Sequence, residues 1–307
     1  PKPIAARLSL VETWEVWKPM AKLGAAFMLG GLATTATLLV VRGRISQELG
    51  LDAAGYFAAA WGITMTYVGF LLGAMGSDYY PRLTEVIHDK VAVVQLMNDQ
   101  VQLGLAIGGP VLLLLIGLAP WVITLLYSSA FEPAVTLLQW QMLGNVFKLA
   151  SWALAFSIVA AARGKTFFFM ELSFNIIFLG MVLIFLPYIG LKVTAYAFVL
   201  GYLIYLTIVY VLARNIHGFR WQALSLGMLG LHSSLGVALM VLALIAPLVA
   251  AVASPLLAAA TGLFGLRVVL IKIGATSRIA ARVARIYVVI GWPIIHTKTK
   301  PDNESTK

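Results

Sequence analysis

Eight apolar stretches, each long enough to cross a lipid bilayer as a helix, constrain this 307-residue chain more than any other feature. About 20 consecutive apolar residues span the hydrocarbon core of a bilayer. The stretches are residues 20–41, 53–76, 101–127, 133–165, 166–186, 193–213, 224–250 and 255–273. Hydrophobic residues make up 61% of the chain and charged residues only 11%, which excludes a water-soluble fold of this length. We therefore predict an all-α integral membrane protein with about eight transmembrane helices.

The remaining composition excludes several classes of function. The formal net charge of +10 indicates membrane topology and lipid contact, because no interleaving of basic and aromatic residues suggests a nucleic-acid surface. The absence of cysteine excludes disulfides, thiol catalysis and thiolate metal sites, and the four histidines lack metal-ligand spacing. We expect no metal, no cofactor and no nucleic-acid partner.

Basic residues outside the apolar stretches are distributed unevenly between the two sets of connecting segments. One set holds the N-terminal region, the tail and the loop residues Arg82, Lys90, Arg163, Lys165, Arg214 and Arg220. The opposite set holds only Arg42, Arg44 and Lys192. Because Lys and Arg concentrate in the cytoplasmic loops of membrane proteins, we predict that both ends of the chain are cytoplasmic.

Two amphipathic segments flank or interrupt the apolar stretches. Residues 81–100 alternate apolar and charged positions at helical spacing, which predicts an interfacial linker helix. Residues 274–307 are basic, and their first part predicts an amphipathic cytoplasmic helix suited to the anionic lipids of that leaflet.

The stretch 133–165 carries a charge at membrane depth. Lys148 lies on the order of 20 Å from either end of this run, too far for its side chain to reach water by snorkelling. Gln141, Asn145 and Trp152 share its helix face, with the i, i+4, i+7, i+11 spacing. Such a stripe indicates a path or site for a hydrophilic, anionic ligand. The alternative is a structural lysine bonded to a neighbouring helix.

Two segments carry a resemblance to a known family. Residues 55–83 (GYFAAAWGITMTYVGFLLGAMGSDYYPRL) and 137–152 (LLQWQMLGNVFKLASW), followed by the glutamate of FFFMELSFN, resemble polysaccharide flippases of the multidrug/oligosaccharidyl-lipid/polysaccharide exporter superfamily. The O-antigen and enterobacterial-common-antigen translocases of bacterial inner membranes are the nearest type. The resemblance covers residues 20–213 and implies that they form one six-helix lobe of a two-lobe flippase. Residues 1–19 would be a lead-in, residues 214–273 two additional helices, and residues 274–307 the tail.

The resemblance also implies a function. A flippase of this kind moves an undecaprenyl-pyrophosphate-linked oligosaccharide from the cytoplasmic to the periplasmic leaflet by alternating access, without hydrolysing ATP. A proton or sodium gradient could drive it. Its expected partners are the lipid-linked substrate, the missing N-terminal lobe or another copy, anionic membrane lipids, and the polysaccharide polymerase machinery. The alternatives are a drug or metabolite exporter of the same superfamily and an integral-membrane glycosyltransferase or polymerase, although the short loops hold no cluster of catalytic acids.

The candidate substrate site follows from the chemistry of such a cargo. A pyrophosphate needs cationic and amide donors, which Lys148, Asn145 and Gln141 supply, and Arg42 is either a second anion contact or an interface anchor. Trp152 and Tyr56 could stack on sugars or simply pack the bundle.

Four further residues are candidates for coupling or gating. Glu171 and Asn175 lie one turn apart, and they form either a cation or proton site or a gate near the cytoplasmic end. The different depths of Glu171 and Lys148 predict that the two do not form an ion pair. Asp78 and Arg82 form either a gate salt bridge or part of a solvated loop.

Overall fold

Eight long helices make up the computed structural model, which describes residues 10–273 and residues 282, 284, 285, 287, 289 and 292. They are α1 (Leu10–Leu49), α2 (Leu51–Glu85), α3 (Lys90–Leu126), α4 (Pro133–Ala160), α5 (Gly164–Ile189), α6 (Lys192–His217), α7 (Ala223–Ile245) and α8 (Pro247–Ile273). A short 3-10 turn, Ser129–Phe131, precedes α4, and the described residues contain no strand. All eight helices are long and apolar enough to cross a membrane, which confirms the all-α membrane fold. Most of the predicted tail lies outside the described residues.

The predicted linker helix at residues 81–100 is wrong. Helix α2 continues through Pro81 to Glu85, and α3 begins at Lys90 after a short turn. The side chain of Asp89 caps α3 by accepting hydrogen bonds from the backbone N–H groups of Val91 and Ala92, at 2.9 and 3.1 Å. The amphipathic pattern therefore belongs to the ends of two transmembrane helices, each with one face in the core.

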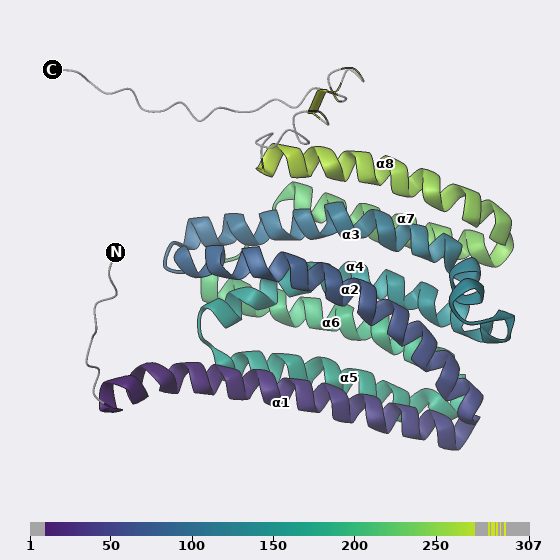
Figure 1. Ribbon diagram of the computed structural model, residues 1–307, viewed down its shortest axis with the longest axis horizontal. Helices are drawn as coiled ribbons and strands as arrows, with labels where there is room; N and C mark the ends of the chain where they lie inside the picture. Colours follow the sequence, from purple (N-terminus) through teal and green to yellow (C-terminus); the bar gives the residue numbers. More distant parts are fainter. Residues whose placement is uncertain are drawn as a thin grey trace.

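Helix α4 is the centre of the bundle. It packs against α2, α3, α6 and α7, while α1 and α5 lie side by side along one edge and α8 along the other (Figure 1). The additional helices α7 and α8 both pack on α3. Successive helices alternate in direction, so the first residues of α1, α3, α5 and α7 share one end of the bundle. We call this the basic end, because Lys90, Arg163, Lys165, Arg214 and Arg220 all lie there.

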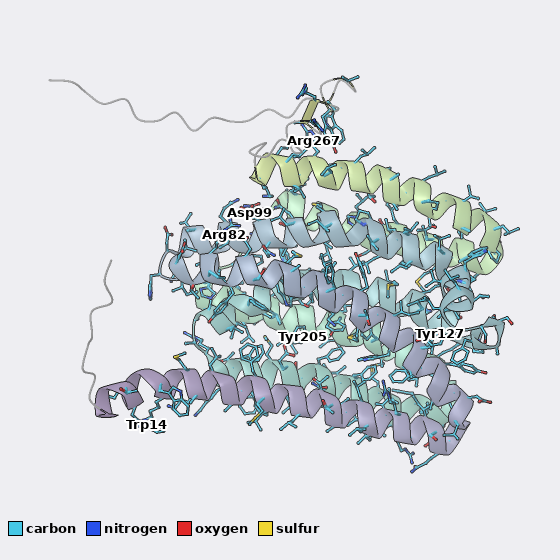
Figure 2. The ribbon with its side chains drawn as sticks, viewed as in Figure 1. Trp14, Arg82, Asp99, Tyr127, Tyr205 and Arg267 are labelled. Carbon is cyan, nitrogen blue, oxygen red and sulfur yellow. The ribbon has the colours of Figure 1, made fainter. Side chains whose placement is uncertain are left out.

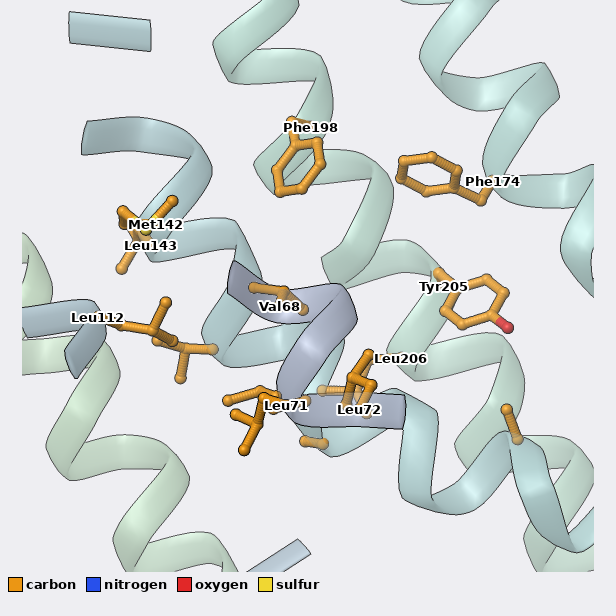
Figure 3. Close-up of a cluster of buried hydrophobic side chains, with 14 of the residues drawn as sticks. Val68, Leu71, Leu72, Leu112, Met142, Leu143, Phe174, Phe198, Tyr205 and Leu206 are labelled. Carbon is orange, nitrogen blue, oxygen red and sulfur yellow. The ribbon is translucent and has the colours of Figure 1, made fainter. Parts of the chain in front are cut away.

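Small residues set how closely these helices approach. A Cβ at Gly144 of α4 would lie 2.5 Å from the ring of Phe198, so the missing side chain makes room for this aromatic residue of α6. Phe198 packs against the rings of Trp61 of α2 and Phe174 of α5, and it belongs to the same buried cluster as Val68 and Leu143 (Figure 3). The result is a tightly packed centre from which polar side chains can be held in fixed positions.

A buried carboxamide joins α7 to α3. The Asn98 side chain is fully buried, and its amide nitrogen donates to the carbonyl oxygens of Val94 and Arg220, both at 3.0 Å. Its oxygen accepts from the Gln222 backbone N–H at 2.9 Å and from the Ser225 hydroxyl at 2.8 Å. Because all four hydrogen bonds of this group are made, it fixes the start of α7 against α3.

Candidate functional site

A cavity of about 450 Å³ lies between α1, α4, α5 and α6. By helix rise, it extends from near the basic end to Lys148, roughly 18 Å along α4 from its last residue. Tyr205, at its wall, is labelled in Figure 2 between the α1–α5 edge and the rest of the bundle. The lining residues are Phe27, Gly30, Gly31, Thr34, Lys148, Ser151, Trp152, Ala155, Phe156, Phe167, Glu171, Tyr202 and Tyr205.

No counter-charge of the described residues is bonded to the Lys148 ammonium. Its Nζ lies 3.5 Å from the sulfur of Met65 and 5.3 Å from the centroid of the Tyr202 ring. Among the described residues, none of the ion pairs includes Lys148. The face of an aromatic ring attracts a cation but does not neutralise it. The ammonium is therefore available to an anion that enters the cavity.

Glu171 faces the same cavity from α5. The Tyr205 hydroxyl donates a 2.5 Å hydrogen bond to its carboxylate. Gly30 of α1 lies beside it, where an added Cβ would meet the Glu171 Cβ at 3.7 Å, an ordinary contact distance. Glu171 and Lys148 line the same cavity, and no ion pair joins them within the part of the chain that the structure describes. They are linked instead through α6, because Tyr202 and Tyr205 lie three residues apart on that helix.

A small polar cluster adjoins Glu171. The Asn175 amide nitrogen donates to the Thr34 hydroxyl at 3.2 Å and to the Glu171 carbonyl oxygen at 2.9 Å. The Asn175 side-chain oxygen is buried without a hydrogen-bond partner among the described residues. Acceptor oxygens from a carboxylate, an amide and a hydroxyl therefore gather where α1 meets α5.

The predicted stripe on α4 divides into two parts. Lys148 and Trp152 line the cavity, whereas Gln141 and Asn145 are fully buried outside its lining. The Gln141 side chain accepts a 2.8 Å hydrogen bond from the Thr64 hydroxyl of α2, and the Asn145 side chain donates to the Gln141 carbonyl oxygen at 2.8 Å. The two amides face packed helices rather than the cavity.

The other predicted residues lie away from the cavity. Arg42 is exposed near the last residues of α1, at the end of the bundle opposite the basic end. Tyr56 lies at that same end and packs edge-on against Phe131, with 5.5 Å between ring centroids. Asp78 and Arg82 form a 3.0 Å ion pair between successive turns of α2, with both side chains largely exposed, so this pair does not connect two helices.

Three residues of the cavity lining, Tyr202, Tyr205 and Thr34, were not among the predicted site residues. Four tyrosines on α6, including Tyr202 and Tyr205, were a visible signal, but periodicity alone does not say which face of a helix meets a cavity. Thr34 lies on α1, which contributes no charged residue to the lining.

Comparison with known protein families gives one match. Residues 4–136 match a family described as "Polysaccharide biosynthesis protein". The match runs from the start of the chain through α1, α2 and α3 into the first residues of α4, which is less than half of the 307 residues. It supports a multi-pass membrane protein of the polysaccharide-biosynthesis type. The comparisons with curated proteins and with solved structures found no match.

Proposed function

We propose that this protein moves an undecaprenyl-pyrophosphate-linked oligosaccharide, such as an O-antigen unit, across a bacterial inner membrane by alternating access. The observation that carries the proposal is the Lys148 ammonium, which lies unpaired among the described residues in a cavity at membrane depth. A charge in this position costs about 2.5–3.5 kcal/mol on insertion scales, and such charges usually mark a substrate path. The match to a polysaccharide-biosynthesis family supports the same class of substrate.

The cavity chemistry suits both parts of this cargo. Lys148 would form a charge-assisted hydrogen bond with the pyrophosphate. The Ser151 hydroxyl donates to the Lys148 carbonyl oxygen at 2.9 Å and keeps its oxygen as an acceptor for a sugar hydroxyl. The rings of Trp152 and Tyr202 line the cavity and offer apolar contact area to a sugar. None of these groups would act as a catalyst, so we propose transport without chemical conversion. A drug exporter would need no pyrophosphate site, and a polymerase would change the chain length of the glycan.

The position of the cavity suggests the direction of transport. If the positive-inside rule holds, the basic end and both chain ends are cytoplasmic, and the cavity lies nearer the cytoplasmic leaflet. The substrate would then enter from that leaflet. A cavity of about 450 Å³ can hold only part of an oligosaccharide, so we propose that a second lobe, from the same protein or from another copy, completes the passage.

A leaflet-translocation assay tests this proposal. The full-length gene product would be reconstituted in proteoliposomes with a defined undecaprenyl-pyrophosphate oligosaccharide in the outer leaflet, and its loss from that leaflet would be followed with a membrane-impermeant lectin. We expect protein-dependent loss without a change in glycan length. Undiminished outer-leaflet substrate would refute the proposal, and elongation of the glycan would support the polymerase alternative.

Glu171, Asn175 and Thr34 form the proposed coupling site. The cluster could bind a sodium ion through its oxygens, or the carboxylate could take up a proton. Either event changes the net charge beside Lys148 and could bias α1 and α5 between two arrangements.

Glu171→Gln is expected to remove the response to an ion gradient. Glutamine keeps the size of the side chain but cannot be ionised. The increase in translocation rate caused by an imposed proton or sodium gradient should therefore be at least tenfold smaller in the variant than in the wild type. The measurement is the translocation rate with and without each gradient. Tyr205→Phe, which keeps the carboxylate and removes one hydrogen bond, should still respond. An unchanged response in Glu171→Gln would assign Glu171 a structural role.

A further inference from the structure

A second hollow lies on the other side of the α1–α5 pair from the cavity. It is a groove of about 810 Å³ formed by the first half of α1, the α4–α5 turn and the start of α5. On α1, the groove residues Ala25 and Leu29 each lie two positions, or about 200° around the helix, from the cavity residue Phe27. Figure 1 shows α1 and α5 at the edge of the bundle, where no other described helix covers them. The groove therefore faces outward, away from the cavity.

The groove is cationic at one end and apolar at the other. Lys22, Arg163 and Lys165 line it at the basic end, and all three are exposed. Further along, the lining is apolar and includes Leu29 and Phe169, which are 48% and 65% exposed. Helices α1 and α5 both start at this end, so on each helix the cations precede the apolar residues in the same direction.

This polarity matches the membrane interface. Trp14 and Trp17, which precede Lys22 on α1, are both about half exposed, as expected for interfacial tryptophans. Cations near them would lie at headgroup level, and Leu29, about 10 Å further along the helix, would lie among acyl chains. None of the three cations belongs to the ion pairs of the described residues. One carboxylate, Glu15, lines the adjacent hollow. Two lysines, Lys18 and Lys22, line the same hollow, so the cations outnumber the carboxylate there.

We propose that this groove binds an anionic phospholipid of the surrounding leaflet. The phosphate would be held by Lys22 of α1 and by Arg163 and Lys165 at the start of α5, and an acyl chain would lie along Leu29 and Phe169. The three cations favour an anionic over a zwitterionic lipid, because they would repel the ammonium of a zwitterionic headgroup. The lipid would bridge the two helices whose opposite faces line the transport cavity.

The test compares two double variants with equal loss of charge. Lys22→Gln/Lys165→Gln removes two cations of the groove, and the control Arg214→Gln/Arg220→Gln removes two exposed cations at the same end but outside it. Each full-length protein would be delipidated in neutral detergent and titrated with phosphatidylglycerol or phosphatidylcholine. Native mass spectrometry would count bound lipids, and the shift in unfolding temperature would report binding independently.

The wild type should bind phosphatidylglycerol in preference to phosphatidylcholine. Each groove cation removed should weaken phosphatidylglycerol binding about fivefold, so the groove variant should bind about 25-fold more weakly, and the control less than twofold. A third variant, Ala25→Trp, keeps every cation but places a large side chain in the groove where an acyl chain would lie, so it should also lose lipid binding. Glycerophosphoglycerol, the headgroup without chains, should not compete, which distinguishes a lipid site from a phosphate site.

Three results would overturn the proposal. One is equal phosphatidylglycerol affinity in the groove and control variants, and another is equal binding of the two lipids by the wild type. The third is self-association of the wild type that protects Lys22 and Lys165 from chemical labelling in the absence of lipid. That result would assign the groove to a second copy of this chain.

Discussion

Replacing Lys148 with alanine is expected to abolish polysaccharide export while the protein still inserts and folds. Loss of one partner of a buried charge pair typically costs about 2–5 kcal/mol, so binding of the pyrophosphate should weaken at least about 30-fold. Folding should not suffer, because Lys148 belongs to none of the ion pairs of the described residues and its charge is costly to place at this depth. The stability of the variant should therefore equal or exceed that of the wild type.

The measurement is complementation of a deletion strain, with the amount of membrane-inserted protein determined in parallel. Lys148→Arg should retain part of the activity because it keeps the charge, although its planar head needs more room than the ammonium. Lys192→Ala is a matched control, since it removes a lysine from the opposite end of the bundle. Full complementation by Lys148→Ala at normal protein levels would exclude Lys148 from the substrate site.

Replacing Gly265 with valine is expected to separate α8 from α3. A Cβ at this position would overlap the carbonyl oxygen of Ala106 and lie 2.9 Å from the Ala106 Cα. Backbone atoms cannot rotate away as a side chain can, so the two helices must move apart. Overpacking of a core typically costs about 1–3 kcal/mol, and we expect the upper part of that range or more here. The unfolding temperature should fall by roughly 5 °C or more.

Gly262→Ala is the control for this prediction. It lies one turn away on α8, where a new Cβ would meet Pro110 at 3.7 Å, an ordinary contact distance. Its unfolding temperature should stay the same or rise slightly, because alanine favours a helix more than glycine does. Residues of α8 do not line the cavity, so Gly265→Val should keep its translocation activity below its unfolding temperature. Equal stability of the two variants would contradict the close approach of α3 and α8.

The sequence predicted the membrane fold but misjudged one connection. Hydropathy located all eight spans, but the amphipathic pattern at residues 81–100 predicted a separate interfacial helix that the structure does not contain. The same pattern arises where Leu83 at the end of α2 and Val93 at the start of α3 are buried while the nearby Arg82 and Val91 are exposed. Periodicity cannot distinguish a helix that lies on a membrane from two helix ends partly buried in a core.

The candidate site was predictable only in part. Lys148 and Glu171 stood out because ionisable residues at membrane depth are rare, and both line the cavity. Gln141 and Asn145 share the helix face of Lys148, yet they are sealed by packed helices. Whether a residue on that face meets a cavity depends on the neighbouring helix at its depth, and this is not encoded within the 133–165 stretch.

The amino-acid sequence by itself determined that the chain crosses the membrane in helices and where its buried charges lie along them. This follows because a helix satisfies its backbone hydrogen bonds within one contiguous segment, so its formation in lipid is a local property. Only the tertiary structure decided which residues meet: Tyr202 with Lys148, Tyr205 with Glu171, and Thr34 with Asn175. Those pairings depend on how α1, α5 and α6 are rotated and how closely they approach their neighbours, and small residues such as Gly144, which makes room for Phe198 of α6, set that distance.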